Sequence, residues 1–130
     1  MTRNEAREIL MQIMYEMDAS KNMTAAASNK LAEERLTGNH RQRGAKLLQN
    51  IVENIQAIDE IINDSSKSWK TNRMPKVDLA IMRLALGEVK YSDDVPTAVA
   101  INEAINLAKK YSANQSARFI NGVLGSAVKK

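Results

Sequence analysis

Aromatic and basic side chains near the end of the chain have types and spacing that could do chemistry. The stretch SANQSARFING, residues 112–122, holds the only phenylalanine, Phe119, which follows Arg118 and comes shortly after Asn114 and Gln115. Single-stranded RNA is typically recognised by stacking of its bases on aromatic rings and arginine planes. The stretch therefore suits a base-stacking platform, whereas burial in the core is the default for an aromatic residue on a helix.

Helical periodicity leaves these two interpretations of Phe119 open. When Ile120 is taken as the centre of the apolar stripe of the last helix, Phe119 lies about 100° away from it and Arg118 faces the opposite side. The ring then sits on the shoulder of the stripe. Either it packs edge-on against the next helix, or one of its faces stays open to solvent.

A second basic feature lies at the start of the chain. Arg3 and Arg7 are one helical turn apart, so we expect them to emerge from one side of the first helix. The helix dipole disfavours cations at this end, so a purely structural account gains little from the placement. On spacing alone an ordinary solvated pair is slightly favoured. The net charge of +4 suits a nucleic-acid partner without requiring one.

The sequence contains no motif that indicates catalysis. There is no glycine-rich phosphate loop, no nucleophile elbow and no spaced cluster of metal ligands. The chain has no cysteine, and His40 is its single histidine. We therefore expect no enzyme activity, no cofactor and no metal site. We also expect a cytoplasmic protein without a targeting segment or membrane span, because cysteine is absent and the longest charge-free stretch, residues 119–128, is short.

The elements that must position these residues all have helical periodicity. Isoleucines and Leu48 recur at spacings of three and four and predict one long amphipathic helix over residues 41–64. Thr2 with Glu5, and Ser112 with Gln115, have the spacing of a capping box. The sequence predicts a single all-α domain over residues 1–130, with six or seven helices.

The segment VDLAIMRLALGEV, residues 77–89, is apolar on almost every side and predicts a helix at the centre of the bundle. Its charged residues are Asp78, Arg83 and Glu88. Any of them that is buried needs a partner, because an uncompensated buried charge costs several kcal/mol. The sequence leaves open whether that partner lies within the chain or across an interface.

Three stretches resemble the NusB family of bacterial transcription antitermination factors. AREILMQIMYEMD, residues 6–18, is similar to the opening of that family, and residues 77–89 resemble its central helix. VPTAVAINEAINLAKKYSANQSARFINGVL, residues 95–124, is very similar to its signature. The resemblance extends over essentially the whole chain, and residues 21–38 match least.

This resemblance implies a compact helical fold of two packed subdomains and no catalysis. Family members bind the boxA sequence of nascent RNA, chiefly in ribosomal RNA leaders, together with the small-subunit ribosomal protein NusE. The resulting complex on RNA polymerase suppresses termination. Some members form homodimers that hide the RNA surface, so the resemblance also implies a homodimer as an alternative state.

The resemblance also assigns site residues. The implied RNA surface consists of Arg3, Arg7, Tyr15, Asn114, Gln115, Arg118 and Phe119, and the implied partner face surrounds Asp78. Asn4 and Glu5 stand where relatives carry further arginines, so we expect weak RNA binding by the isolated protein, with NusE supplying much of the rest. Whether Arg41, Arg43 and Lys46 extend the RNA surface is left open, and a solvated helix start is the preferred interpretation.

Two other hypotheses remain. The first is the helical RNA-binding appendage of rRNA cytosine methyltransferases, which has the same fold; such an enzyme would also carry a cofactor-binding glycine loop and catalytic cysteines, which this sequence lacks. The second is a helical module that dimerises through its apolar faces and binds no RNA. Competition with scrambled RNA separates the second hypothesis from a sequence-selective RNA-binding factor.

Overall fold

The computed structural model describes residues 1–130 and contains seven α-helices, one short 3₁₀-helix and no strand. The elements in chain order are α1 (Arg3–Ala19), α2 (Ala25–Arg35), α3 (Asn39–Glu53), α4 (Ile55–Ser65), η1 (Thr71–Arg73), α5 (Lys76–Tyr91), α6 (Thr97–Tyr111) and α7 (Ser116–Ala127). The predicted all-α class and the predicted number of helices are confirmed. None of the helices combines the length and the apolar composition that a bilayer span requires.

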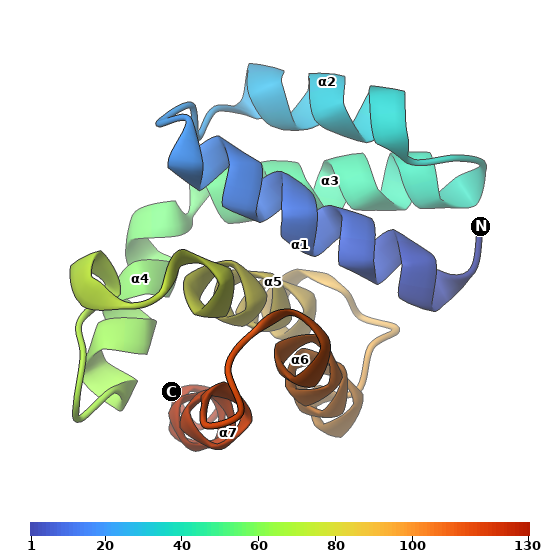
Figure 1. The fold of residues 1–130 in the computed structure, drawn as a ribbon. Coiled ribbons are helices and arrows are strands. Elements are labelled where there is room, and N and C mark those ends of the chain that lie inside the picture. Colours follow the sequence, from blue (N-terminus) through green and yellow to red (C-terminus); the bar gives the residue numbers. More distant parts are fainter.

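The helices form two groups that share one core. Helices α1, α2 and α3 pack against one another, and α4, α6 and α7 pack against α5. In Figure 1 the first group lies above the second, with α5 between them. A single cluster of 29 buried apolar residues runs through both groups. The two helical subdomains are therefore joined by a continuous core.

Helix α5 is the centre of this bundle. It contacts α1, α3, α4, α6 and α7, and every residue from Asp78 to Glu88 is buried. The prediction of a central helix is therefore confirmed. Its charges find partners within the chain: the Arg83 guanidinium donates from Nε and Nη2 to the two carboxylate oxygens of Asp59, at 2.9 and 2.7 Å.

The prediction of one long helix over residues 41–64 is wrong, because Asn54 divides it. The Asn54 backbone, at φ −117° and ψ 22°, leaves the helical region, and its side-chain amide donates to the Asn50 carbonyl at 2.8 Å. Asparagine side chains compete in this way with the helical ladder. The break redirects the apolar stripe, so that α3 packs in the first group while α4 packs against α5 and α7.

The two capping predictions have opposite outcomes. The Thr2 hydroxyl accepts a hydrogen bond from the Glu5 amide at 3.1 Å, which confirms the predicted start of α1. The capping box at Ser112 is wrong: Ser112 ends α6, and α7 begins at Ser116 without a side-chain cap. The Ser112 hydroxyl instead donates a hydrogen bond to Asp78, which belongs to the site described below.

Candidate nucleic-acid interface

A hydrogen bond to the buried carboxylate of Asp78 holds the loop between α6 and α7. Ser112 donates its hydroxyl hydrogen to Asp78, and the Ser112 and Ser116 hydroxyl oxygens lie 3.0 Å apart. Asp78 stands in the first turn of α5, where the helix dipole favours a negative charge, and is 1% exposed. Its carboxylate has no free surface for a partner. That the surface around Asp78 binds a protein partner stays a prediction.

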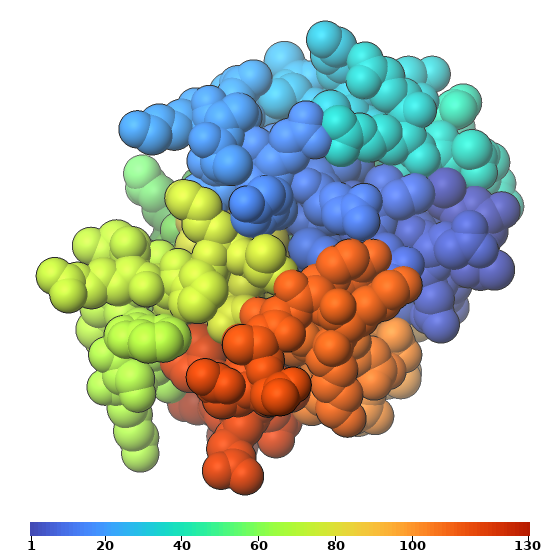
Figure 2. Space-filling model, viewed as in Figure 1, coloured from blue at the N-terminus to red at the C-terminus, as the bar shows by residue number.

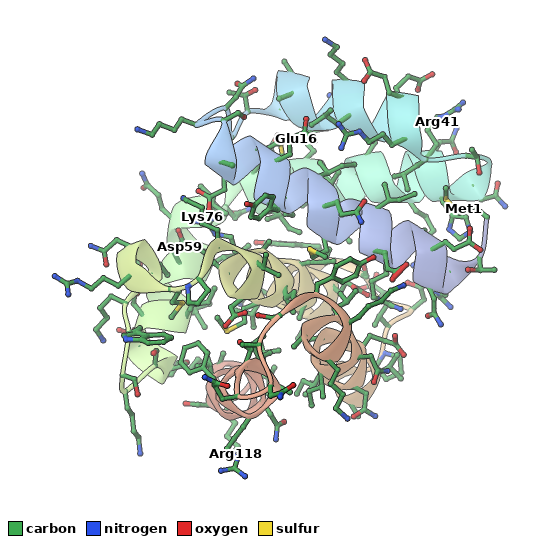
Figure 3. All side chains as sticks on the ribbon, in the orientation of Figure 1. Met1, Glu16, Arg41, Asp59, Lys76 and Arg118 are labelled. Atoms are coloured by element: carbon green, nitrogen blue, oxygen red, sulfur yellow. The ribbon has the colours of Figure 1, made fainter.

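This loop presents polar side chains to solvent. Asn114 and Gln115 are exposed, and so is Arg118 in the first turn of α7. In Figure 3 the Arg118 side chain points away from the body of the protein, and it has no carboxylate partner. These three residues therefore lie together on the surface.

Phe119 takes a position between the two interpretations that the sequence left open. Its ring is half-buried and packs against the edge of the core. It also contacts Trp69, with ring centroids 5.6 Å apart and planes inclined by 61°, an edge-to-face geometry. Trp69 itself is 46% exposed. Phe119 is thus a shoulder residue with a second aromatic ring beside it.

The two rings border a hollow of about 350 Å³, which we call the aromatic hollow. It lies between the connector that precedes α5 and the start of α7. Its lining consists of Ser68, Trp69, Pro75, Asp78, Ala113, Gln115, Ser116, Arg118 and Phe119. Two aromatic rings, an arginine and an exposed glutamine therefore border one hollow on the surface.

Arg7 is not the solvated arginine that its spacing predicts. It is 8% exposed, and its guanidinium donates from Nε and Nη2 to the two oxygens of buried Glu88, at 2.9 and 2.8 Å. The hydrogen bond to Glu88 raises the pKa of Arg7, and the more distant Glu103 adds to the effect. The expectation that Arg3 and Arg7 emerge together is therefore wrong. Arg7 joins α1 to α5.

Arg3 remains on the surface and lies beside Arg43. Asp94, in the loop between α5 and α6, accepts hydrogen bonds from Arg3 at 2.9 Å and from Arg43 at 3.0 Å. The three side chains are each about half exposed. Two arginines from α1 and α3 therefore share one carboxylate, while Arg41 bonds to the Leu36 carbonyl and Lys46 is exposed.

The exposed face of α1 continues onto the end of α6. Glu8 accepts hydrogen bonds from Lys110 and from the Tyr111 hydroxyl, the latter at 3.0 Å. Tyr15 follows Glu8 by two helical turns, so the two residues share one face of α1. Tyr15 is 40% exposed. Figure 2 shows α1 and the end of α6 side by side on one face of the molecule.

Acidification is expected to weaken this contact between α1 and α6. The hydrogen bond from Lys110 outweighs burial and, with the Tyr111 hydroxyl, holds the pKa of Glu8 below its ordinary value of 4.5. A carboxylate with a lowered pKa stabilises the fold above its unfolded pKa and loses this effect as the pH falls through the folded pKa. The melting temperature of Glu8→Gln should therefore lie below that of the wild type at neutral pH. The difference should begin to shrink as the pH falls below about 4.5 and should vanish once the pH lies below the lowered pKa of Glu8.

Thermal unfolding followed by circular dichroism over a pH series measures this difference. Glu60→Gln is the matched control, because Glu60 is exposed and forms no ion pair. Its melting curve should follow the wild type at every pH. A Glu8→Gln difference that persists unchanged into acid would contradict the assignment.

The amino-acid sequence matches the NusB family over residues 4–129. The chain belongs to the NusB family. It is similar to the transcription antitermination protein NusB of Agathobacter rectalis, with 42% identity over 127 residues that cover 95% of this chain and 97% of the relative. Its fold is similar to that of T. maritima NusB, with a TM-score of 0.88, 27% identity and coverage of 100% of this chain and 92% of the other.

A solved complex of the antitermination factors NusB and NusE with double-stranded RNA contains a similar chain. The TM-score is 0.82 and the identity 24%, over 98% of this chain and 96% of that chain. At this identity the likeness shows a shared fold. The curated relative is named for transcription antitermination, and the match covers nearly its whole length. This disfavours the interpretation as a methyltransferase appendage.

In this NusB-family chain the assigned residues fall into three places. Asn114, Gln115, Arg118 and Phe119 come together at the start of α7. Tyr15 and Arg3 lie on α1, about 18 Å apart along the helix axis. Arg7 and Asp78 are internal.

Sequence reasoning missed two exposed aromatic residues, Trp69 and Tyr111. Trp69 stands between a serine and a lysine in a polar connector, outside any helical stripe. An aromatic residue in such a place has no apolar neighbours in the sequence to pack against. That signal could have identified it as a surface residue of this NusB-family fold.

Proposed function

We propose that this NusB-family chain is a transcription antitermination factor that binds boxA RNA of ribosomal RNA leader transcripts together with NusE. The bound pair would then join an antitermination complex on RNA polymerase. The chain itself would supply binding surfaces and no catalysis, and this role would place it in the cytoplasm. A homodimer that covers the RNA surface is the alternative state implied by the family.

The arrangement at the start of α7 carries this proposal. A half-buried phenylalanine holds an aromatic edge at the surface, an unpaired Arg118 stands beside it, and Asn114 and Gln115 are free to hydrogen-bond. Unstacked bases are recognised by such combinations of aromatic ring, guanidinium plane and polar side chains. The solved complex of a similar chain with NusE and RNA supports the choice of partners.

The residues on α1 contribute differently to the proposed surface. Tyr15 offers a second exposed ring, and Arg3 offers a phosphate contact once it leaves Asp94. Arg7 is engaged with Glu88, so it would act by holding α1 in place. Each phosphate contact to a single strand adds about −0.7 to the slope of log affinity against log salt. Because Arg3 is the one arginine of α1 that could reach a phosphate, α1 should add little to the affinity and to the slope without NusE.

Replacing Phe119 by alanine is expected to weaken boxA binding by about 1–3 kcal/mol, because one aromatic contact to a base is lost. Fluorescence anisotropy of labelled boxA RNA measures this loss, with and without NusE and at two salt concentrations. Scrambled RNA of the same length reports sequence selectivity. Addition of NusE should tighten the binding of boxA more than that of the scrambled RNA.

Leu31→Ala is the matched control for lost packing, because Leu31 is a half-buried apolar residue on α2 that contacts the same core. It should lower the melting temperature and leave RNA affinity unchanged. Equal binding of boxA and scrambled RNA, in the presence of NusE, would count against the proposed function. If Phe119→Ala only melts the protein, Phe119 belongs to the core alone.

A further inference from the structure

The indole of Trp69 is held in place at the surface without being buried. The Trp69 amide donates to the Ser66 hydroxyl at 3.3 Å, and the Thr71 amide donates to the Asn63 side chain at 2.8 Å. Lys70 also donates to the Asn63 carbonyl at 2.9 Å. The connector is thus anchored to the end of α4 on both sides of Trp69. Its backbone fixes an exposed aromatic ring, the largest exposed apolar side chain in the protein.

The geometry of the two rings leaves room for a third flat group. Their planes are inclined by 61° in an edge-to-face contact, so the two rings do not cover each other as they would in a parallel stack, and Trp69 keeps 46% of its surface exposed. A planar ligand that stacks on Trp69 would meet the Phe119 ring at its edge, which is a favourable arrangement for aromatic groups. The volume of about 350 Å³ is within the range of small-ligand sites.

The charges around the aromatic hollow suit a nucleic acid. Arg118 lines it, and the connector that carries Trp69 also carries Lys67, Lys70 and Arg73, none of which forms an ion pair. The acidic residue in the lining, Asp78, is buried and already bonded to Ser112. A base that stacks on Trp69 in the hollow would therefore place its flanking phosphates near these cations.

We propose that the aromatic hollow receives one unstacked base of the bound RNA, with Trp69 as the stacking ring and Phe119 as its edge. Gln115, exposed at the rim, supplies an amide that can hydrogen-bond the edge of that base. This inference rests on the proposed function and adds Trp69 to the residues that would contact RNA. It also assigns the hollow to RNA and not to the protein partner.

The tryptophan itself provides the test, because Trp69 is the sole tryptophan of the chain and its fluorescence reports on this hollow alone. Unlabelled boxA RNA, added to the protein with NusE present, should quench the emission with the same midpoint as the anisotropy titration. A series of boxA oligonucleotides, each with one abasic position, should abolish the quenching at one position only.

Two substitutions complete the test. Trp69→Leu should weaken boxA binding roughly tenfold or more, the usual effect of losing one base–aromatic stack, while Trp69→Phe should retain most of the affinity. At the abasic position that abolishes quenching, wild type and Trp69→Leu should bind equally. Both variants should keep the melting temperature close to that of the wild type, because the indole is half exposed.

The outcomes separate this inference from the proposed function. If boxA binds with its selectivity intact while Trp69 emission and Trp69→Leu affinity stay unchanged, the inference fails and the function stands. If NusE alone quenches Trp69 and RNA adds nothing, the hollow is a protein-docking site and the inference also fails. If boxA is not preferred to scrambled RNA even with NusE, both fail together.

Discussion

Replacing Arg7 by methionine is expected to lower the free energy of unfolding by about 3–5 kcal/mol, because it leaves the Glu88 carboxylate buried without its counter-ion. Both partners are more than nine-tenths buried, and two hydrogen bonds below 3 Å join them. Glu103, which lies 3.9 Å from Arg7, is also an acid and cannot serve Glu88 as a counter-ion. Denaturant unfolding of the purified variant measures the loss.

A double variant and a surface control test whether the loss of stability comes from the unpaired buried charge. Arg7→Met combined with Glu88→Leu should recover most of the lost stability, because an apolar pair of similar volume replaces a buried ion pair at little net cost. Arg35→Met should have a much smaller effect, because solvent screens the exposed pair of Arg35 with Glu16. A loss in Arg7→Met no greater than that in Arg35→Met would contradict the structural role of Arg7.

Replacing Gly87 by alanine is expected to destabilise the protein by about 1–3 kcal/mol through overpacking. A Cβ atom at Gly87 would lie 2.3 and 2.4 Å from Cδ1 and Cγ1 of Ile51, on α3. Ile51 is fully buried and cannot easily withdraw. The close approach of α5 to α3 therefore requires a residue without a side chain.

Gly122→Ala is the matched control, since Gly122 also lies inside a helix but a Cβ atom there would meet no neighbouring atom within 4 Å. It should stabilise the protein by about 0.5–1 kcal/mol, the ordinary gain of alanine over glycine in a helix. The opposite signs can be measured in one denaturant series. Adding Ile51→Val to Gly87→Ala removes the atom Cδ1 and should restore part of the loss; equal gains at both glycines would contradict the crowding.

The central helix and the overall class could be predicted from sequence because they depend on local periodicity. Residues 77–89 are apolar on nearly every side, and only the middle of a bundle satisfies such a helix. The partners of its charges could not be predicted. Arg7 and Glu88 are 81 residues apart, so only the packing of α1 on α5 brings them together. For the same reason the spacing of Arg3 and Arg7 predicted a shared exposed face that Arg7 does not have.

The candidate site was predictable on its polar side and less so on its aromatic side. Asn114, Gln115 and Arg118 are exposed because they surround a helix start, a local property. The neighbour of Phe119 was not predictable, because Trp69 reaches it from a connector 50 residues earlier through the packing of α4 on α7. The break at Asn54 depends on one side chain within a continuous apolar pattern, which periodicity alone does not resolve.

The ion pair between α1 and α5 also has a consequence for synthesis on the ribosome. At about 5–20 residues per second, the 81 residues that separate Arg7 from Glu88 take on the order of 4–16 s to be made. During that interval α1, whose Ile13, Met14 and Met17 are fully or almost fully buried in the finished protein, lacks the helix with which it has its most extensive contact. The side of α1 that packs on α5 is therefore exposed until the centre of the bundle has been made, and such transiently exposed apolar surface is prone to aggregate.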